Sequence, residues 1–186
     1  MKGTFNIFMA GVGGQGIGLL AELMARAADY AGWKVRACDT HGLAQRGGMV
    51  TSHLRLGDSN SPLVPDGRAD LVLALERTEA LRAAALMLRD GGTLAWYDAT
   101  WQALDVRTGS TPAVTAADVE AAVAARGGTA IRVHRDDLAD PRMQNTALVA
   151  VVLARAAVPG LDASHVKKAM ADLLPEAALK ANLSLL

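Results

Sequence analysis

The sequence contains very little cysteine. Cys38 is the only cysteine among 186 residues. A single cysteine cannot form an intramolecular disulfide, and it cannot hold an iron–sulfur cluster unless another chain supplies the remaining ligands. A lone cysteine beside an apolar strand is typical of a small buried hydrophobic residue, so we assign Cys38 no redox role.

Aromatic residues and net charge are also scarce. Phe, Tyr and Trp together make up 4% of the residues, which argues against a base-stacking surface for single-stranded nucleic acid. Nineteen basic and nineteen acidic residues cancel. No global field therefore draws the chain toward nucleic acid or an anionic membrane, and we expect neither as a partner.

No apolar run approaches the roughly 18 residues that a membrane-spanning helix needs. The longest candidate, residues 147–158, is too short and contains Arg155. Residues 1–10 lack the long apolar stretch and the small-residue cleavage site of a signal peptide. We therefore expect a cytoplasmic protein.

What the sequence does contain is an alternation of short apolar segments and amphipathic ones. The apolar residues 7–10 predict a strand, the helical spacing over residues 17–31 predicts a helix, and residues 35–38 predict a second strand. This order is a βαβ unit, for which a parallel sheet with a right-handed crossover is expected. Residues 49–56 alternate between apolar and polar positions, which predicts a half-buried strand.

The alternation continues to the C-terminus. Further strands are predicted at residues 71–75, 93–97 and 130–133, and further helices at residues 76–88, 115–126, 142–157 and 162–173. Gly91 and Gly92 are expected to end the first of these helices, and Thr115 with Asp118 to form a capping box at the start of the second.

These elements predict an α/β fold without any linker-like segment. About half of the residues are apolar, enough for a substantial core. We expect a single three-layer Rossmann-like domain over residues 1–186, with a mostly parallel sheet and a helical C-terminal third.

Residues 11–16, GVGGQG, follow a predicted strand and open a predicted helix. In that context a G-x-G-x-x-G loop lets backbone amides approach an anion, and the helix N-terminus adds partial positive charge. Asp39 ends the next strand, about where the acid of a dinucleotide-binding fold meets a ribose hydroxyl. The glycines can equally serve only the turn and close helix packing, so this motif alone leaves both interpretations open.

A second polar loop, THGLAQRGG at residues 40–48, follows the second predicted strand. It should lie beside the first loop, at the edge where open α/β sheets bind ligands. Arg46 can hold a phosphate or carboxylate through two hydrogen bonds, and the glycines after it keep backbone within reach. His41 and Gln45 can hydrogen-bond the same ligand or a partner chain. The structural alternative is that Arg46 pairs with Asp39 and His41 caps a turn.

Together the two loops resemble a known family. GVGGQG, the helix, the short strand, HGLAQRGG and a strand containing SHLRLG resemble the gamma domain of 2-oxoacid:ferredoxin oxidoreductases. The HG-x-AQRGG form most resembles the small (beta) subunit of indolepyruvate ferredoxin oxidoreductase. ADLVLALE at residues 69–76, Asn145 and Asn182 also match the family, so the resemblance covers nearly the whole chain. Departures are the absence of a glycine often found within residues 145–150 and the presence of Asp39.

The resemblance implies an oxidative decarboxylation, in which a 2-oxoacid and coenzyme A give acyl-CoA, CO2 and reduced ferredoxin. This chain would be a subunit that is inactive alone and has no catalytic residue or metal ligand of its own. Thiamine diphosphate, magnesium and 4Fe-4S clusters would belong to a large partner subunit, in a heterotetramer that reduces ferredoxin. The isolated chain is expected to be capable of forming a homodimer.

In such relatives the domain packs on the thiamine-bearing domains and helps to form the coenzyme A site. The residues that the resemblance places at the cofactor's phosphates or at the subunit interface are Gly11, Gly13, Gly14, Gln15, Gly16, His41, Gln45, Arg46, Gly47, Gly48 and Asn145.

Two alternatives remain open from the sequence. One is a free-standing NAD(P)-binding Rossmann dehydrogenase, which the glycine loop and Asp39 favour. Against it, no histidine, lysine or tyrosine site at useful spacing follows residue 60, since His134 and His165 stand isolated in the sequence. The other is a non-enzymatic small-molecule-binding scaffold that kept the fold without an oxidoreductase partner.

Overall fold

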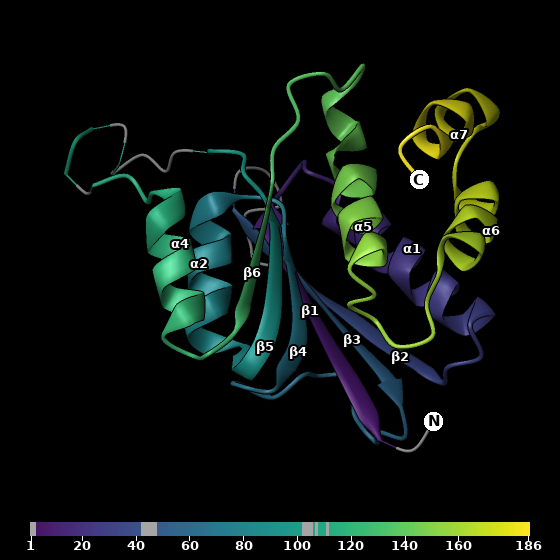
Figure 1. The fold of residues 1–186 in the computed structure, drawn as a ribbon, viewed down its shortest axis with the longest axis horizontal. Helices are drawn as coiled ribbons and strands as arrows, with labels where there is room; N and C mark the ends of the chain where they lie inside the picture. The colour runs from purple at the N-terminus through teal and green to yellow at the C-terminus, as the bar shows by residue number, and fades with distance from the viewer. Residues whose placement is uncertain (1–2, 42–47, 102–105, 107, 111) are drawn as a thin grey trace.

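The protein is built around one six-stranded sheet with helices on both faces (Figure 1). The computed structural model describes residues 3–41, 48–101, 106, 108–110 and 112–186. The strand order across the sheet is β2-β3-β1-β4-β5-β6. The strands are β1 (Thr4–Val12), β2 (Val35–His41), β3 (Met49–Gly57), β4 (Ala69–Ala74), β5 (Leu88–Tyr97) and β6 (Thr129–Val133).

Four neighbouring strands, β1, β4, β5 and β6, are parallel, as the alternating pattern predicts. β3 runs antiparallel to both β1 and β2. The predicted βαβ unit therefore exists, with β2 pointing in the same direction as β1, but β3 has been inserted between its two strands. The predicted mostly parallel α/β sheet is confirmed, with an antiparallel strand near one edge.

The helices form the two outer layers of the molecule. On one face lie α1 (Ile17–Tyr30), α5 (Gln144–Ala154), α6 (Ala163–Leu173) and α7 (Glu176–Leu183), and on the other lie α2 (Arg77–Leu86) and α4 (Ala116–Ala124) (Figure 1). A 3-10 turn, Pro141–Met143, leads into α5. Within the described part of the chain, no helix is both long and apolar enough to cross a bilayer.

Alternating strand residues supply the two halves of the core. Ile7 and Met9 of β1 point toward the face covered by α1, whereas Phe8 and Ala10 point toward the face covered by α2. This alternation follows from the period of two in a strand, and a strand buried on both faces must be apolar at every position. The predicted capping box at Thr115 is confirmed, since its side chain and that of Asp118 satisfy each other's backbone amides.

The prediction that β3 is half buried is wrong. Thr51, Ser52 and His53 are buried along with the apolar positions of the strand. β3 is an internal strand, and the segment after it folds back over its polar face, where the Val64 N–H donates to His53 Nδ1 (3.1 Å). Local alternation identifies the face that points toward α1, but it carries no information about what covers the opposite face.

The prediction that Gly91 and Gly92 end a helix is also wrong. α2 ends at Leu86, and both glycines lie inside β5, which begins at Leu88. The pairing between β4 and β5 changes register after Ala69, so the strand bends at its glycines. A Cβ on Gly92 would lie 3.0 Å from the Arg89 carbonyl oxygen and 3.1 Å from the Ala69 carbonyl oxygen, so the backbone crowds any side chain at this position.

Candidate functional site

The connections from β1 and β4 diverge at the centre of the sheet. β1 leads into α1 on one face, and β4 leads into α2 on the other, although the two strands are parallel neighbours. In open α/β sheets such a divergence leaves a crevice at the carboxyl ends of the strands, where ligands bind. The glycine loop at residues 11–16 lies at this point, beside the start of α2.

The glycines of this loop serve both the turn and close packing. Gly14 and Gly16 have φ angles of 106° and 83°, which other residues adopt only with strain. A Cβ on Gly11 would lie 2.8 Å from Ile17 Cδ1, whereas one on Gly14 would meet no atom within 4 Å. Gly11 is therefore explained by packing against α1. Gly14 is exposed and has open space beside it, which a bound molecule can occupy.

The two predicted loops meet in the structure. The Gly13 N–H donates to the Gly48 carbonyl oxygen (2.8 Å), and Val12 pairs with Met49 where β1 and β3 begin their ladder. Of the HGLAQRGG segment, the structure describes the first residue, His41, and the last, Gly48. Gln45, Arg46 and Gly47 lie outside the described residues, so their predicted roles stay predictions. His41 ends β2, where its backbone pairs with Val50.

Gln15 holds the glycine loop from within. Its Nε2 donates to the Leu75 carbonyl oxygen (2.7 Å), and its Oε1 accepts from the Val12 N–H (2.8 Å). Both ends of the side-chain amide are therefore bonded to backbone. Gln15 is a positioning residue in this geometry, and a ligand at the loop would meet backbone amides instead.

Two amides of the loop have no acceptor among the described residues. The N–H groups of Gly13 and Gln15 are bonded to Gly48 and Val12, whereas those of Gly14 and Gly16 donate to none of the residues that the structure describes. They stand at the N-terminus of α1, where the helix dipole adds positive potential. This arrangement suits a phosphate or carboxylate oxygen.

Asn145 joins the helical C-terminal third to this loop. Its Nδ2 donates to the Gly16 carbonyl oxygen (3.0 Å) from the start of α5. A Cβ on Gly16 would lie 2.9 Å from that nitrogen, so the glycine is needed for the contact as well as for its φ angle. The structure thus brings Asn145 to the predicted loop, although 129 residues separate the two in sequence.

Asp39 is not placed as a dinucleotide-binding fold requires. It lies on β2, and β3 separates β2 from β1. Two strand spacings put β2 about 9–10 Å from β1 across the sheet. The Asp39 carboxylate accepts from Ser52 Oγ on β3 (2.5 Å). The contact with Ser52 therefore explains Asp39 better than ribose recognition does, and the predicted pairing of Asp39 with Arg46 stays a prediction because Arg46 lies outside the described residues.

The sequence did not reveal a buried acidic pair at the start of α2. Glu76 caps the helix, since its carboxylate accepts from the N–H groups of Glu79 (3.0 Å) and Trp101 (3.1 Å). Burial raises the pKa of the neighbouring Glu79, although its Oε1 pairs with Arg82 (2.6 Å). In the sequence one acidic residue stands three positions before another, as in a capping box. This spacing is the pattern that could have indicated the pair.

A second polar cluster lies at the carboxyl end of β5. The Asp98 carboxylate accepts from Arg77 Nε (2.6 Å) and Arg132 Nε (2.7 Å). Burial tends to raise the pKa of Asp98, but the hydrogen bonds and charges of the two arginines outweigh it and hold that pKa below its usual value. Three separate segments contribute to this cluster, so no local motif could predict it.

The sequence matches the family described as pyruvate ferredoxin/flavodoxin oxidoreductase over residues 6–186. The chain belongs to this family. The indolepyruvate oxidoreductase subunit IorB of Archaeoglobus fulgidus is 51% identical over 82 residues, which is 44% of this chain and 41% of that protein. The corresponding subunit of Methanothermobacter thermautotrophicus is 44% identical over 84 residues, 45% of this chain and 43% of its own length. The matched segment thus spans less than half the length of these relatives.

Solved structures show the same fold. The gamma subunit of a keto/oxoacid ferredoxin oxidoreductase from Geobacter sulfurreducens superposes with a TM-score of 0.63 at 22% identity, covering 97% of this chain and 93% of that one. The 2-oxoglutarate:ferredoxin oxidoreductase from Magnetococcus marinus, whose structure holds 2-oxoglutarate, coenzyme A and succinyl-CoA, superposes with a TM-score of 0.71 at 16% identity. There the match covers all of this chain and 30% of the larger one.

Proposed function

We propose that this chain is the small subunit of a 2-oxoacid:ferredoxin oxidoreductase whose substrate is an arylpyruvate such as indolepyruvate. Membership of the family and the names of the relatives support this reaction class. With a larger subunit, the complex would convert the 2-oxoacid and coenzyme A to acyl-CoA and CO2 and pass the electrons to ferredoxin. The domain that takes part would comprise residues 1–186.

The observation that carries the proposal is the junction of the two loops through Gly13 and Gly48. This bond puts the start of β3, and with it the end of the HGLAQRGG loop, directly beside the open amides of Gly14 and Gly16. One anion could then meet backbone donors from the first loop and the Arg46 guanidinium from the second. A phosphate of coenzyme A fits such a set of donors.

The residues of this chain fit coenzyme A but not the redox groups. Among the described residues the Gly14 N–H has no acceptor and no atom lies within 4 Å of where its Cβ would be, which suits close approach by a phosphate. Cys38 is the only cysteine, and burial raises the pKa of its thiol, which opposes the thiolate that a cluster requires. We assign thiamine diphosphate, magnesium and the 4Fe-4S clusters to the partner, in a heterotetramer.

The test is reconstitution with the large subunit. Arg46→Ala is expected to raise the apparent KM for coenzyme A at least tenfold, because a two-point contact with a phosphate is lost. Arg155→Ala is the matched control, since Arg155 is exposed at the end of α5, away from both loops. An unchanged KM and unchanged assembly in the Arg46 variant would remove Arg46 from the site. Viologen reduction across a panel of 2-oxoacids then identifies the substrate.

The dehydrogenase alternative is tested with the same preparation. The position of β3 between β2 and β1 takes Asp39 away from the glycine loop, so we expect no calorimetric binding of NAD or NADP at micromolar concentrations. Micromolar binding of either would favour the alternative. A failure of the large subunit to associate at all would favour the non-enzymatic scaffold.

A further inference from the structure

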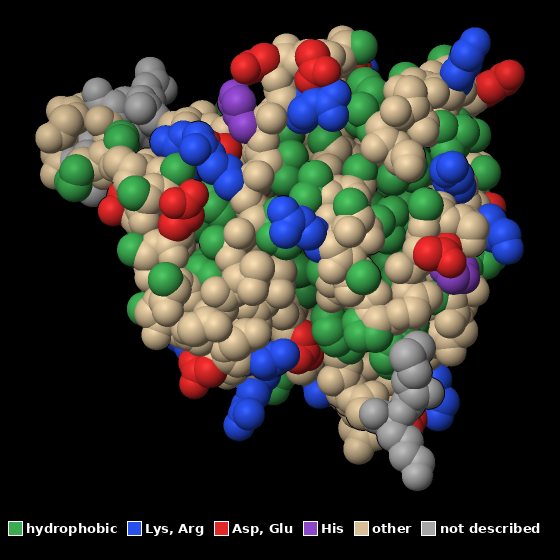
Figure 2. Space-filling view, viewed as in Figure 1, with side chains coloured by type: hydrophobic (Ala, Val, Ile, Leu, Met, Phe, Trp, Pro, Cys, Tyr) green, Lys and Arg blue, Asp and Glu red, His purple; other side chains and the backbone are tan. Residues whose placement is uncertain are grey.

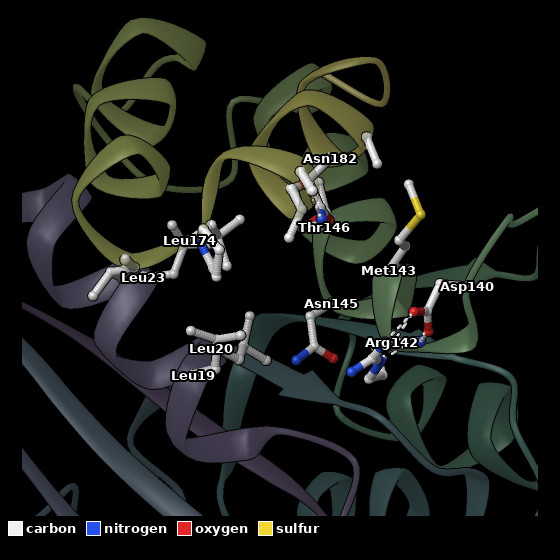
Figure 3. Close-up of a pocket in the computed structure, with 15 residues that line it drawn as sticks. Leu19, Leu20, Leu23, Asp140, Arg142, Met143, Asn145, Thr146, Leu174 and Asn182 are labelled. Atoms are coloured by element: carbon white, nitrogen blue, oxygen red, sulfur yellow. Dashed lines mark hydrogen bonds and ion pairs between the residues drawn. The ribbon is translucent and has the colours of Figure 1, made fainter.

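A cavity separate from the glycine loop has Asn145 in its wall. It is a cleft of about 590 Å³ between α1, the start of α5 and the C-terminal helices (Figure 3). Apolar side chains form most of its wall. They are Leu19, Leu20, Leu23, Met143, Leu173, Leu174, Pro175, Ala177, Ala178 and Ala181. Figure 2 shows hydrophobic side chains gathered between α5 and the C-terminal helices, with charged side chains around them.

The size and the walls of this cleft suit a small molecule. Protein sites for such ligands commonly measure about 300–1,000 Å³ and are mainly apolar with a few polar groups. Leu19 is 42% exposed at the rim, although it is a large apolar residue. α7 has no buried residue of its own, so its alanines border the cleft without filling it. The described residues therefore leave this apolar surface uncovered.

Nearly every polar group on the wall already has a partner. Arg142 pairs with Asp140 (2.6 Å) at the mouth of the cleft. The Thr146 hydroxyl donates to Asn182 Oδ1 (2.5 Å), and Asn182 Nδ2 donates to the Ala178 carbonyl oxygen (2.8 Å). The Thr146–Asn182 bond also ties α7 to α5. The hydrogen-bonding capacity of these polar groups is therefore largely used.

The exception is the carbonyl oxygen of Asn145. The residue is 5% exposed, and its Oδ1 is buried without a hydrogen-bond partner among the described residues. Its Nδ2 is fixed by the Gly16 carbonyl oxygen, so the amide cannot turn over to exchange its two ends. In Figure 3 the amide projects from α5 with its nitrogen toward Leu20 of α1 and its oxygen on the side of Arg142, which also lines the cleft. A buried acceptor without a partner is costly, and a ligand that brings a donor removes that cost.

We propose that this cleft is a binding site for an apolar molecule that carries an N–H or O–H donor, which bonds to Asn145 Oδ1. The donor requirement excludes an ionised carboxylate at that position, because such a group only accepts hydrogen bonds. The site is therefore chemically distinct from the glycine-loop amides, which take an anion. Asn145 lines the cleft and also contacts the glycine loop, because its Nδ2 donates to the Gly16 carbonyl oxygen. The inference stands on the cleft alone and does not depend on the proposed reaction.

Indole and indene are a matched pair of probes for the full chain. They have nearly the same shape, but only indole has an N–H donor. Titrations followed by ¹H–¹⁵N NMR are expected to show indole binding about threefold to tenfold more tightly than indene, the range that one net hydrogen bond gives. Shifts should be centred on residues of α1, α5 and α7 that line the cleft. Equal affinities, or shifts located elsewhere, would overturn the proposal.

Variants locate the site. Ala178→Phe fills the cleft and should abolish indole binding, whereas Ala171→Phe, on the exposed side of α6, should leave it unchanged. Leu19→Glu, at the rim, provides a second test that does not depend on tolerance of a large residue at position 178. Indole binding that survives both cleft variants would overturn the proposal. Complete displacement of indole by the large subunit would also overturn it, by assigning the cleft to a subunit interface.

Discussion

The side chain of Gln15 joins the ends of two parallel strands. Its Nε2 donates to the carbonyl oxygen of Leu75, 2.7 Å away, which is the first residue after β4. The Leu75 N–H in turn donates to the Ala10 carbonyl oxygen on β1 (2.9 Å). The glycine loop is thus held across the point where the two chain connections diverge, before any ligand is bound.

Replacing Gln15 with Ala should lower the free energy of unfolding by about 1–3 kcal/mol, because the Val12 N–H and the Leu75 carbonyl oxygen lose their partner. Chemical denaturation measures this change. Gln144→Ala is the control, since its amide makes only a long contact with the Gln15 carbonyl oxygen (3.5 Å). Equal losses in the two variants would contradict the role given to Gln15.

Two glycines near the start of α1 should respond oppositely to alanine. Gly16→Ala is expected to cost about 1–2 kcal/mol, because residue 16 has a φ of 83° and its Cβ would lie 2.9 Å from Asn145 Nδ2. Gly18→Ala should stabilise by about 0.5–1 kcal/mol, since position 18 is helical and its Cβ would meet no atom within 4 Å. Thermal unfolding of the pair tests this. Destabilisation by both substitutions would contradict the conclusion that only position 16 requires glycine.

Asp98 should make the protein sensitive to acid. Its pKa is lower in the folded chain than the ordinary 3.8, so the folded state binds fewer protons than the unfolded state in that range. The stabilisation is complete above pH of about 4 and is lost as the pH falls through the lowered pKa. Asp98→Asn should cost about 1–3 kcal/mol at pH 7 and flatten the decline in acid. If the free energy of unfolding of this variant falls with acid as steeply as that of the wild type, groups other than Asp98 cause the acid sensitivity.

His53 should add a pH dependence at a higher range. Burial lowers its pKa from the ordinary 6.5, and its Nδ1 must remain unprotonated to accept from Val64. Because the unfolded state takes up a proton first, the stability that His53 contributes is present above pH of about 6.5 and decreases below it. In His53→Gln the free energy of unfolding should no longer show this contribution to its decrease between pH 7 and pH 5, as followed by chemical denaturation at several pH values. His134→Gln, at a half-exposed histidine, is the control and should keep it.

Much of the architecture was predictable because its signals are local. The apolar spacing over residues 17–31 corresponds to α1 at Ile17–Tyr30, and the box at Thr115 begins α4 as expected. Such patterns reflect which residues of one segment face the core, and they depend little on the rest of the chain. The position of the glycine loop between a strand and a helix follows from the same kind of signal.

The failures came where the outcome depended on distant segments. The insertion of β3 between β1 and β2 is a matter of strand pairing, to which the alternation within residues 49–56 contributes nothing. Gly91 and Gly92 are consistent with either a helix end or a bent strand, and only the pairing with β4 distinguishes the two. The cluster around Asp98 draws on residues from β6 and α2, far apart in the sequence.

By itself the sequence determined the two glycine-rich loops, the strand and helix that frame the first of them, and the kinship that these motifs indicate. Only the tertiary structure decided that Gly13 meets Gly48, that β3 takes Asp39 away from the glycine loop, and that Asn145 contacts Gly16 with one end of its amide while the other lacks a partner. The physical reason is that periodicity and turn chemistry act over a few residues. Strand order and side-chain contacts between remote segments are instead settled when the whole core is buried at once.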